Sequence, residues 1–324
     1  MPDITVAIRD QARELLSSGR VARVMGYAQD RATGLPVPCM VRDAGDVDRL
    51  VFSPLCVQNL ATYLKGAKRE PTAIVAKACD TRALAVKLQE NDVLREDLVV
   101  IAVGCDGVVD PSGVEQQVPR WQRIEETTRE GDVLIVRTDA GEARLSMKAD
   151  AMLRCATCRT PQPVIDDVRI GEFPTAPPEG SDPYRTRVAE LDAMTREERR
   201  AFFVDAFSRC IRCYACRNVC PMCSCERCLA DETRPQWVPR STLGDENEMF
   251  HLVRAMHLAG RCVECGSCES VCPMDVPLMA LSSKMAEEVE AMFGQQAGMD
   301  MEYAPPFSRY KDGDPDLPGH GGEV

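Results

Sequence analysis

A cysteine pattern that occurs twice in the C-terminal half constrains this chain more than any other feature of its sequence. Each copy has the form C-x2-C-x2-C-x3-C and is followed directly by proline. The two copies contain Cys210, Cys213, Cys216 and Cys220, and then Cys262, Cys265, Cys268 and Cys272. Two-residue spacers let one tight loop present three thiolates to one cubane, while the fourth cysteine turns away towards a second cluster. The pattern therefore predicts two 4Fe-4S clusters.

The ligands of these clusters are expected to cross between the two copies, because the fourth cysteine of each copy serves the other cluster. Cluster one is predicted to be held by Cys210, Cys213, Cys216 and Cys272, and cluster two by Cys262, Cys265, Cys268 and Cys220. The alternative is a pair of zinc sites, since C-x2-C pairs also bind zinc. Zinc takes its ligands as two separated pairs, however, and has no use for a triple followed by Cys-Pro.

The N-terminal part of the chain alternates strand and helix patterns. Thr72 to Ala78 is an apolar run that leads into a helical segment, and Asp97 to Val103 is a second strand of the buried type. This βαβ pattern predicts an α/β domain with a parallel or mixed sheet. The other segments expected to be regular are a helix at Ile4 to Leu16, an apolar stretch at Val21 to Tyr27, a helical pattern at Val57 to Gly66, and a hairpin of Gly131 to Thr138 and Glu142 to Met147.

The C-terminal half is predicted to be all-α around its cysteines. Thr195 and Glu198 form a capping-box signal for a helix towards Arg209, and Asp245 to Leu258 and Leu278 to Phe293 show helical periodicity. The domain layout expected from all these patterns is an α/β domain over residues 1–165, a linker rich in Pro, Gly and Asp over 166–185, an all-α ferredoxin-type dicluster domain over 186–295, and a loose tail over 296–324.

Four further cysteines are expected to form a third cluster site in the α/β domain. Cys79 directly follows the first predicted strand of the βαβ unit, and Cys105 comes two residues after the second. Consecutive parallel strands end at the same edge of a sheet, so both thiols should meet there. Cys155 and Cys158 add a C-x2-C pair that would complete a third 4Fe-4S site. The alternative is that Cys79 and Cys105 are only small buried residues, as free cysteines often are.

The remaining cysteines are Cys223, Cys225, Cys228, Cys39 and Cys56. The first three form a C-x-C-x2-C motif directly after the first ferredoxin loop. With Cys39 or Cys56 as a fourth ligand brought over by domain packing, they could hold another cluster or a zinc ion. The alternative is that these thiols stay unligated beside the ferredoxin loop.

The composition excludes several classes of protein. A formal net charge of -12 argues against nucleic acid as a partner, because affinity for phosphate backbones depends on clustered Lys and Arg. The N-terminus lacks the basic and apolar regions of a signal peptide, and no apolar run is long enough to span a bilayer. A cytoplasmic protein without direct membrane insertion is therefore expected. In a reducing compartment, the odd number of 17 cysteines favours metal ligation over disulfides.

Two parts of the sequence resemble known families. Residues 195–290 resemble the α-helical ferredoxin domain of succinate dehydrogenase and heterodisulfide reductase iron-sulfur subunits. The segments AKACDTRALAVKL, VVIAVGCDG and LRCATCRTPQPVIDDVRIGEF resemble the beta subunits of deazaflavin-coenzyme hydrogenases and dehydrogenases, and RCIRCYACRNVCPMCSCERC resembles members of formate dehydrogenase or heterodisulfide reductase complexes. The resemblance implies a core that binds a 4Fe-4S cluster and FAD and passes electrons to a partner's clusters. The order differs from the family pattern, since the dicluster motifs here lie near the C-terminal end.

The favoured hypothesis is an iron-sulfur electron-transfer subunit with no catalytic residue of its own. It would relay electrons between a flavin- or metal-containing oxidoreductase partner and another carrier, in a hydrogenase-, formate dehydrogenase- or heterodisulfide reductase-like complex. A second hypothesis is a flavin-binding subunit that itself reduces a deazaflavin or nicotinamide coenzyme. FAD is supported by the resemblance alone, because neither G-x-G-x-x-G nor a Walker-type motif is present. A third hypothesis is a zinc-bound structural adaptor.

Overall fold

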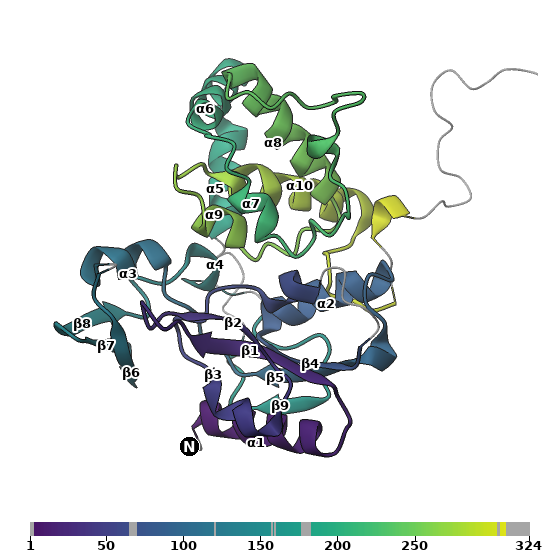
Figure 1. Cartoon of the computed structure of the whole chain (residues 1–324). Coiled ribbons are helices and arrows are strands. Elements are labelled where there is room, and N and C mark those ends of the chain that lie inside the picture. Colours follow the sequence, from purple (N-terminus) through teal and green to yellow (C-terminus); the bar gives the residue numbers. More distant parts are fainter. Residues whose placement is uncertain are drawn as a thin grey trace, which may run out of the picture.

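A mixed β-sheet forms the centre of the N-terminal part, and a group of helices lies on one side of it (Figure 1). The computed structural model describes residues 3–64, 70–119, 121–156, 158, 160–175, 183–302 and 305–308. The strands of the central sheet follow the order β2-β1-β4-β5-β9, with β3 paired to β1. Their bounds are β1 Arg23–Gln29, β2 Pro36–Val41, β3 Leu50–Val51, β4 Thr72–Ala76, β5 Leu98–Val103 and β9 Val168–Ile170.

The expected βαβ unit is present at the centre of this sheet. β4 and β5 pair in parallel, with Thr72 opposite Leu98, and both strands are buried throughout. Strands buried on both faces consist of continuous Val, Ile and Ala runs because helices cover both sides of the sheet. Here α1 (Ile4–Ser17) covers one face, and α2 (Ala78–Gln89) lies on the side towards the helical half (Figure 1). The predicted α/β class with a mixed sheet is confirmed.

The stretch expected to be a linker contributes a strand to the sheet. β9 pairs in parallel with β5, and Asp167 joins the two: its backbone N–H donates to the carbonyl of Val100 over 2.9 Å, and its carboxylate accepts from the N–H of Val100 over 2.7 Å. Three residues are too few to show a strand period, and the neighbouring prolines resemble a linker. Residues 176–182 of the expected linker lie outside the described residues. The helical pattern at 57–66 is realised as a 3-10 helix, Leu60–Leu64.

A second, smaller sheet stands beside the first. It contains β6 (Ile124–Glu130), β7 (Val133–Thr138) and β8 (Gly141–Ser146) in antiparallel order. The β7–β8 pair is the expected hairpin, and β6 extends it by one strand. The short helix α3 (Pro111–Gln117) packs against β8, and the sheet has its own small apolar core.

The C-terminal half is helical, as predicted. Its longer helices are α5 Pro183–Ala193, α6 Arg196–Ser208, α8 Gly244–Leu258 and α10 Leu278–Phe293. The expected capping box at the start of α6 is formed, since the N–H of Glu198 donates to the Thr195 hydroxyl over 3.2 Å and the N–H of Thr195 donates to the Glu198 carboxylate over 2.8 Å. α5 was not expected, and it packs against α10. Among the described helices, none is long and apolar enough to cross a membrane.

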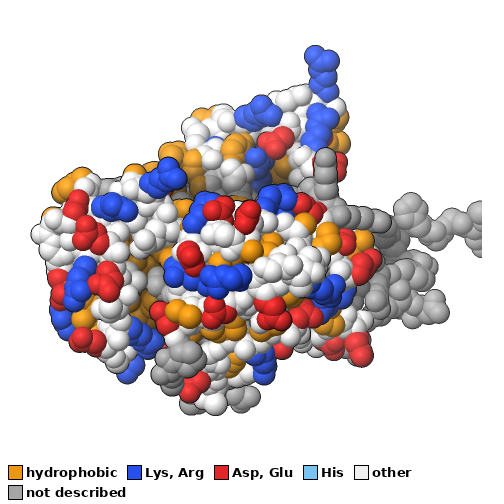
Figure 2. Space-filling model, turned by 60° about the horizontal axis from the view of Figure 1, so that its bottom comes forward, with side chains coloured by type: hydrophobic (Ala, Val, Ile, Leu, Met, Phe, Trp, Pro, Cys, Tyr) orange, Lys and Arg blue, Asp and Glu red, His pale blue; other side chains and the backbone are white. Residues whose placement is uncertain are grey.

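Several contacts join the two halves into one packed body. The Thr62 hydroxyl donates to the carbonyl of Val219 over 2.7 Å, and Arg261 forms a two-point ion pair with Glu90. The first residues of the expected loose tail are also held, because Arg82 donates to the carbonyl of Ala297 over 2.8 Å. The rest of that tail lies outside the described residues, apart from residues 298–302 and 305–308. Figure 2 shows the molecule from below, where acidic and basic side chains are interspersed.

Candidate iron-sulfur sites

The four cysteines predicted for cluster one line a single small cavity in the helical half, and they are called the first set. Its members are Cys210, Cys213, Cys216 and Cys272. Arg212 and Tyr214 have left-handed backbone conformations, with φ of 56° and 61°, and these curl the loop around the cavity. Burial raises the pKa of the Cys216 thiol; Arg254 opposes the shift, and the other thiols of the set add to it. The structure thus brings Cys272 to the loop of the first motif.

The four cysteines predicted for cluster two also lie together, and they are called the second set. Its members are Cys220, Cys262, Cys265 and Cys268. Burial raises the pKa of the Cys262 thiol well above its usual value, and the charges of Glu264 and the other three thiols add to the shift. Gly266, at φ 66°, is required in this loop, because a Cβ there would lie 2.7 Å from the Tyr184 hydroxyl. Cys220 is therefore near the loop of the second motif.

The four cysteines predicted for the α/β domain line one cavity of about 80 Å³, and they are called the third set. Its members are Cys79, Cys105, Cys155 and Cys158. Cys79 lies in the first turn of α2, Cys105 follows β5, and Cys155 lies on the short helix α4 (Leu153–Ala156). Burial raises the pKa of Cys105 to about 12, and the nearby Cys155 thiol adds to the shift. The edge shared by two parallel strands thus brings these four thiols to one cavity.

Three arginines with buried guanidinium atoms lie beside the cysteine sets, and their hydrogen bonding shows whether the sites suit an anionic metal cluster. Arg154, Arg212 and Arg254 each have a buried Nε with no hydrogen-bond partner among the described residues. Arg212 lies between two cysteines of the first set in sequence, and its guanidinium carbon lies 4.5 Å from the centroid of the Phe250 ring. A buried N–H donor without a partner destabilises a folded protein. The same donor becomes favourable when the neighbouring thiolates hold a negatively charged cluster. The residues present therefore fit 4Fe-4S clusters.

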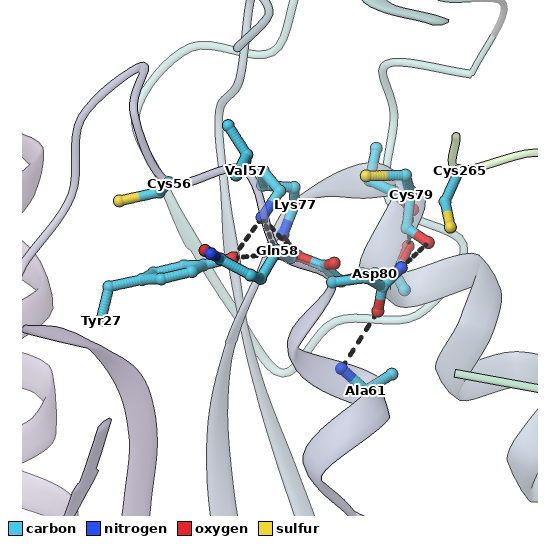
Figure 3. Close-up of polar contacts among 12 residues, drawn as sticks. Tyr27, Cys56, Val57, Gln58, Ala61, Lys77, Cys79, Asp80 and Cys265 are labelled. Atoms are coloured by element: carbon cyan, nitrogen blue, oxygen red, sulfur yellow. Dashed lines mark hydrogen bonds and ion pairs between the residues drawn. The ribbon is translucent and has the colours of Figure 1, made fainter. Parts of the chain in front are cut away.

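Lys77 is a further cation that the sequence analysis missed. Its side chain is 2% exposed and lines the cavity of the third set. The ammonium donates to the Tyr27 hydroxyl and, over 2.9 Å, to the carbonyl of Gln58, and lies 3.1 Å from the Asp80 carboxylate (Figure 3). Burial alone would lower the pKa of Lys77, but Asp80, Tyr27 and Cys79 hold it well above its usual value. The only signal in the sequence was its position two residues before Cys79.

The three sets follow one another through the molecule. Cys216 of the first set adds to the raised pKa of Cys268 in the second set. Val263 and Glu264, from the loop of the second set, line the cavity of the third set. Burial acts to lower the pKa of Arg154, whereas the thiols of Cys79 from the third set and Cys265 from the second set act to raise it, so one arginine lies near both sets. The described cysteines thus form a continuous series from the helical half into the α/β half.

The structure separates the cysteines proposed for a further metal site. Cys223, Cys225 and Cys228 line a cavity of about 570 Å³ together with His257. Cys39 and Cys56, the two candidates for a fourth ligand, are not among the residues that line it. Cys39 pairs with Gly26 inside the sheet, and the sulfur of Cys56 accepts from the N–H of Ser53 over 3.4 Å. No group of three or more His, Cys, Asp or Glu among the described residues is placed to hold a single metal ion.

Comparison with known proteins agrees with this geometry. A family model described as a 4Fe-4S dicluster domain matches residues 206–276, which contain both cysteine motifs. The F420-dependent formate dehydrogenase subunit beta of Methanocaldococcus jannaschii is 31% identical over 102 residues, 32% of this chain and 26% of that subunit. The F420-dependent formate dehydrogenase 1 subunit beta of Methanococcus maripaludis is 24% identical over 358 residues, 90% of each chain. The chain is thus similar in sequence to these two beta subunits.

The alignments with the two beta subunits differ in extent. The alignment with the M. jannaschii subunit spans about a quarter of that relative, whereas the M. maripaludis alignment spans most of both chains. Among solved structures, a chain of the F420-reducing [NiFe] hydrogenase complex from Methanosarcina barkeri matches with a TM-score of 0.39 and 15% identity, over 48% of this chain and 59% of that chain. The family resemblance stated from the sequence motifs is confirmed, as is the presence of a 4Fe-4S dicluster domain.

Proposed function

We propose that this chain is the iron-sulfur electron-transfer subunit of an oxidoreductase complex of the formate dehydrogenase or hydrogenase kind. The observation that carries the proposal is the continuous series of three cysteine sets, each made of four thiols and accompanied by a buried cation. When bound, 4Fe-4S clusters accept and release electrons at potentials set by their surroundings. A series of such sites suits transfer between two partners better than the conversion of one substrate.

The chain's own residues have three roles in this proposal. The thiolates of the first set would hold one cluster, those of the second set another, and those of the third set a third. Arg154, Arg212, Arg254 and Lys77 would offset the negative charge that the thiolates bring into the protein interior. Cys213 is the exposed member of the first set, and the neighbouring Ile211 is 52% exposed. The first set is therefore the proposed end at which a partner approaches.

The names of the relatives support formate dehydrogenase as the type of complex, with a deazaflavin coenzyme at one end of the electron path. Every described cysteine is free of disulfides. The proposal places the chain in a reducing compartment such as the cytoplasm, where thiols stay available to bind metal. A further cluster at Cys223, Cys225 and Cys228, which line one cavity, stays a prediction.

Anaerobic purification from the native host tests the proposed role. The chain is expected to co-purify with subunits of an oxidoreductase, which mass spectrometry would identify. A subunit that only passes electrons has no substrate of its own, so the isolated chain should not turn over formate, hydrogen or a nicotinamide coenzyme. If the isolated monomer catalysed any of these reactions at ordinary enzymatic rates, the relay role would be wrong. Bound flavin in that monomer would then favour the coenzyme-reducing alternative.

A further inference from the structure

We propose that Arg154 and Arg254 each lie between two neighbouring cysteine sets and raise the reduction potentials of the clusters held on both sides. Arg154 would act on the second and third sets, and Arg254 on the first and second. Both are positioning residues in the sense that they act on the clusters through charge and touch no substrate. The inference rests on the proposed function, because it requires clusters at the three sets.

Arg154 connects the third set to the second. It directly precedes Cys155 and lines the cavity of the third set. Its Nη1 donates to the hydroxyl of Ser267 over 3.4 Å, and the Cys265 thiol donates to the same hydroxyl over 3.5 Å. A Cβ at Gly266 would lie 3.4 Å from Cδ of Arg154, so the arginine lies against the loop of the second set. Its Nη2 donates to the carbonyl of Val57 over 3.0 Å, which fixes it in this position.

Arg254 has the equivalent place between the second and first sets. It lies on α8, is 8% exposed, and donates from Nη2 to the carbonyl of Cys216 over 3.2 Å. Its buried Nε has no hydrogen-bond partner among the described residues. Burial opposes its charge, but the thiols of Cys268, Cys220 and Cys216 hold the pKa of Arg254 above its usual value. Two of these thiols belong to the second set and one to the first.

The direction of the effect follows from the charge change on reduction. Each reduction adds one negative charge to a cluster, and a nearby positive charge stabilises the reduced form more than the oxidised form. Arginine stays protonated at any ordinary pH, so it supplies this charge constantly. Coulomb energy falls with distance and with screening, so each arginine acts mainly on its two adjacent sets. Removing the charge should therefore lower two potentials and leave the third nearly unchanged.

Redox titration of anaerobic full-length protein, followed by EPR, tests this pattern. The signals are assigned to the three sets with single cysteine variants. Arg154→Gln is expected to lower the potentials of the second and third clusters, and Arg254→Gln those of the first and second. The expected change is about tenfold in each reduction equilibrium, or 59 mV for a one-electron couple. Arg154→Lys keeps the positive charge at this position, so the potentials of the second and third clusters are expected to stay near their wild-type values.

The matched control is Arg137→Gln on the hairpin strand β7, where the arginine is 57% exposed and pairs with Glu126. It should leave every potential unchanged. Unchanged potentials in iron-loaded Arg154→Gln and Arg254→Gln would overturn the inference, as would an equal shift of all three clusters. If the Arg154→Gln protein does not retain its clusters, the potentials of Arg254→Gln decide whether the inference holds. Wild-type protein without iron would instead overturn the proposed function, and iron at the first two sets alone would leave Arg254→Gln as the deciding variant.

Discussion

Replacing Cys79 and Cys105 together with alanine is expected to lower the iron content of the anaerobic protein from about 12 to about 8 atoms per chain, at four per cubane. Both thiols line the cavity of the third set, and each follows one of two neighbouring parallel strands. A cubane that loses two of its four protein ligands is not retained. Iron and sulfide analysis of the variant beside the wild type measures the loss directly.

Cys39→Ala is the control for this double variant. Cys39 lies on β2 and lines none of the cysteine cavities in the described part of the chain, so its removal should leave the iron content unchanged. Circular dichroism would show that all the variants are folded. A folded Cys79→Ala/Cys105→Ala protein with the full wild-type iron content would show that these two thiols serve packing alone.

Replacing Cys272 with alanine is expected to remove the same EPR signal as replacing Cys210, although Cys272 belongs to the second sequence motif. Both residues line the cavity of the first set, and the thiols of Cys272 and Cys213 both add to the raised pKa of Cys210, after burial itself. A cluster that loses either ligand should convert to a damaged form or be lost. EPR spectra of the two reduced variants, recorded anaerobically, allow the comparison.

The second set supplies the matched comparison. Cys220→Ala and Cys262→Ala should both affect the other signal of the dicluster domain, because burial and the neighbouring thiols raise the pKa of Cys262, with Cys220 among them. The crossed assignment would be wrong if Cys272→Ala changed the same signal as Cys262→Ala. The two pairs of variants therefore decide the assignment without reference to the third set.

The arrangement of the cysteines could be predicted because local rules determine it. The spacing within each ferredoxin motif sets the loop, and the edge of a parallel sheet sets the meeting of Cys79 and Cys105. The helices at 196–208, 244–258 and 278–293 could be predicted equally well. Their apolar residues recur with the helical period over many residues, and Thr195 marks the start of the first of them.

What the sequence did not reveal depends on contacts between distant segments. β9 contains three residues, too few for a period, and its place beside β5 depends on the two hydrogen bonds of Asp167. Arg154 reaches Ser267 across more than a hundred positions of sequence, and no pattern rule connects them. Cys56 was, with Cys39, a candidate fourth ligand for the further metal site, but its side chain lies in the core around the sheet, where burial raises the pKa of its thiol to about 11.

The measurement that tests the relay most directly is a stepwise reductive titration of the intact protein under anaerobic conditions, combined with iron analysis. Three clusters that each accept one electron predict the uptake of about three electrons per chain, with about 12 iron atoms. Three signals should appear in EPR as the electrons are added. Uptake of only two electrons, with about 8 iron atoms and free thiols at the third set, would contradict the account of a relay that runs from the helical half into the α/β half.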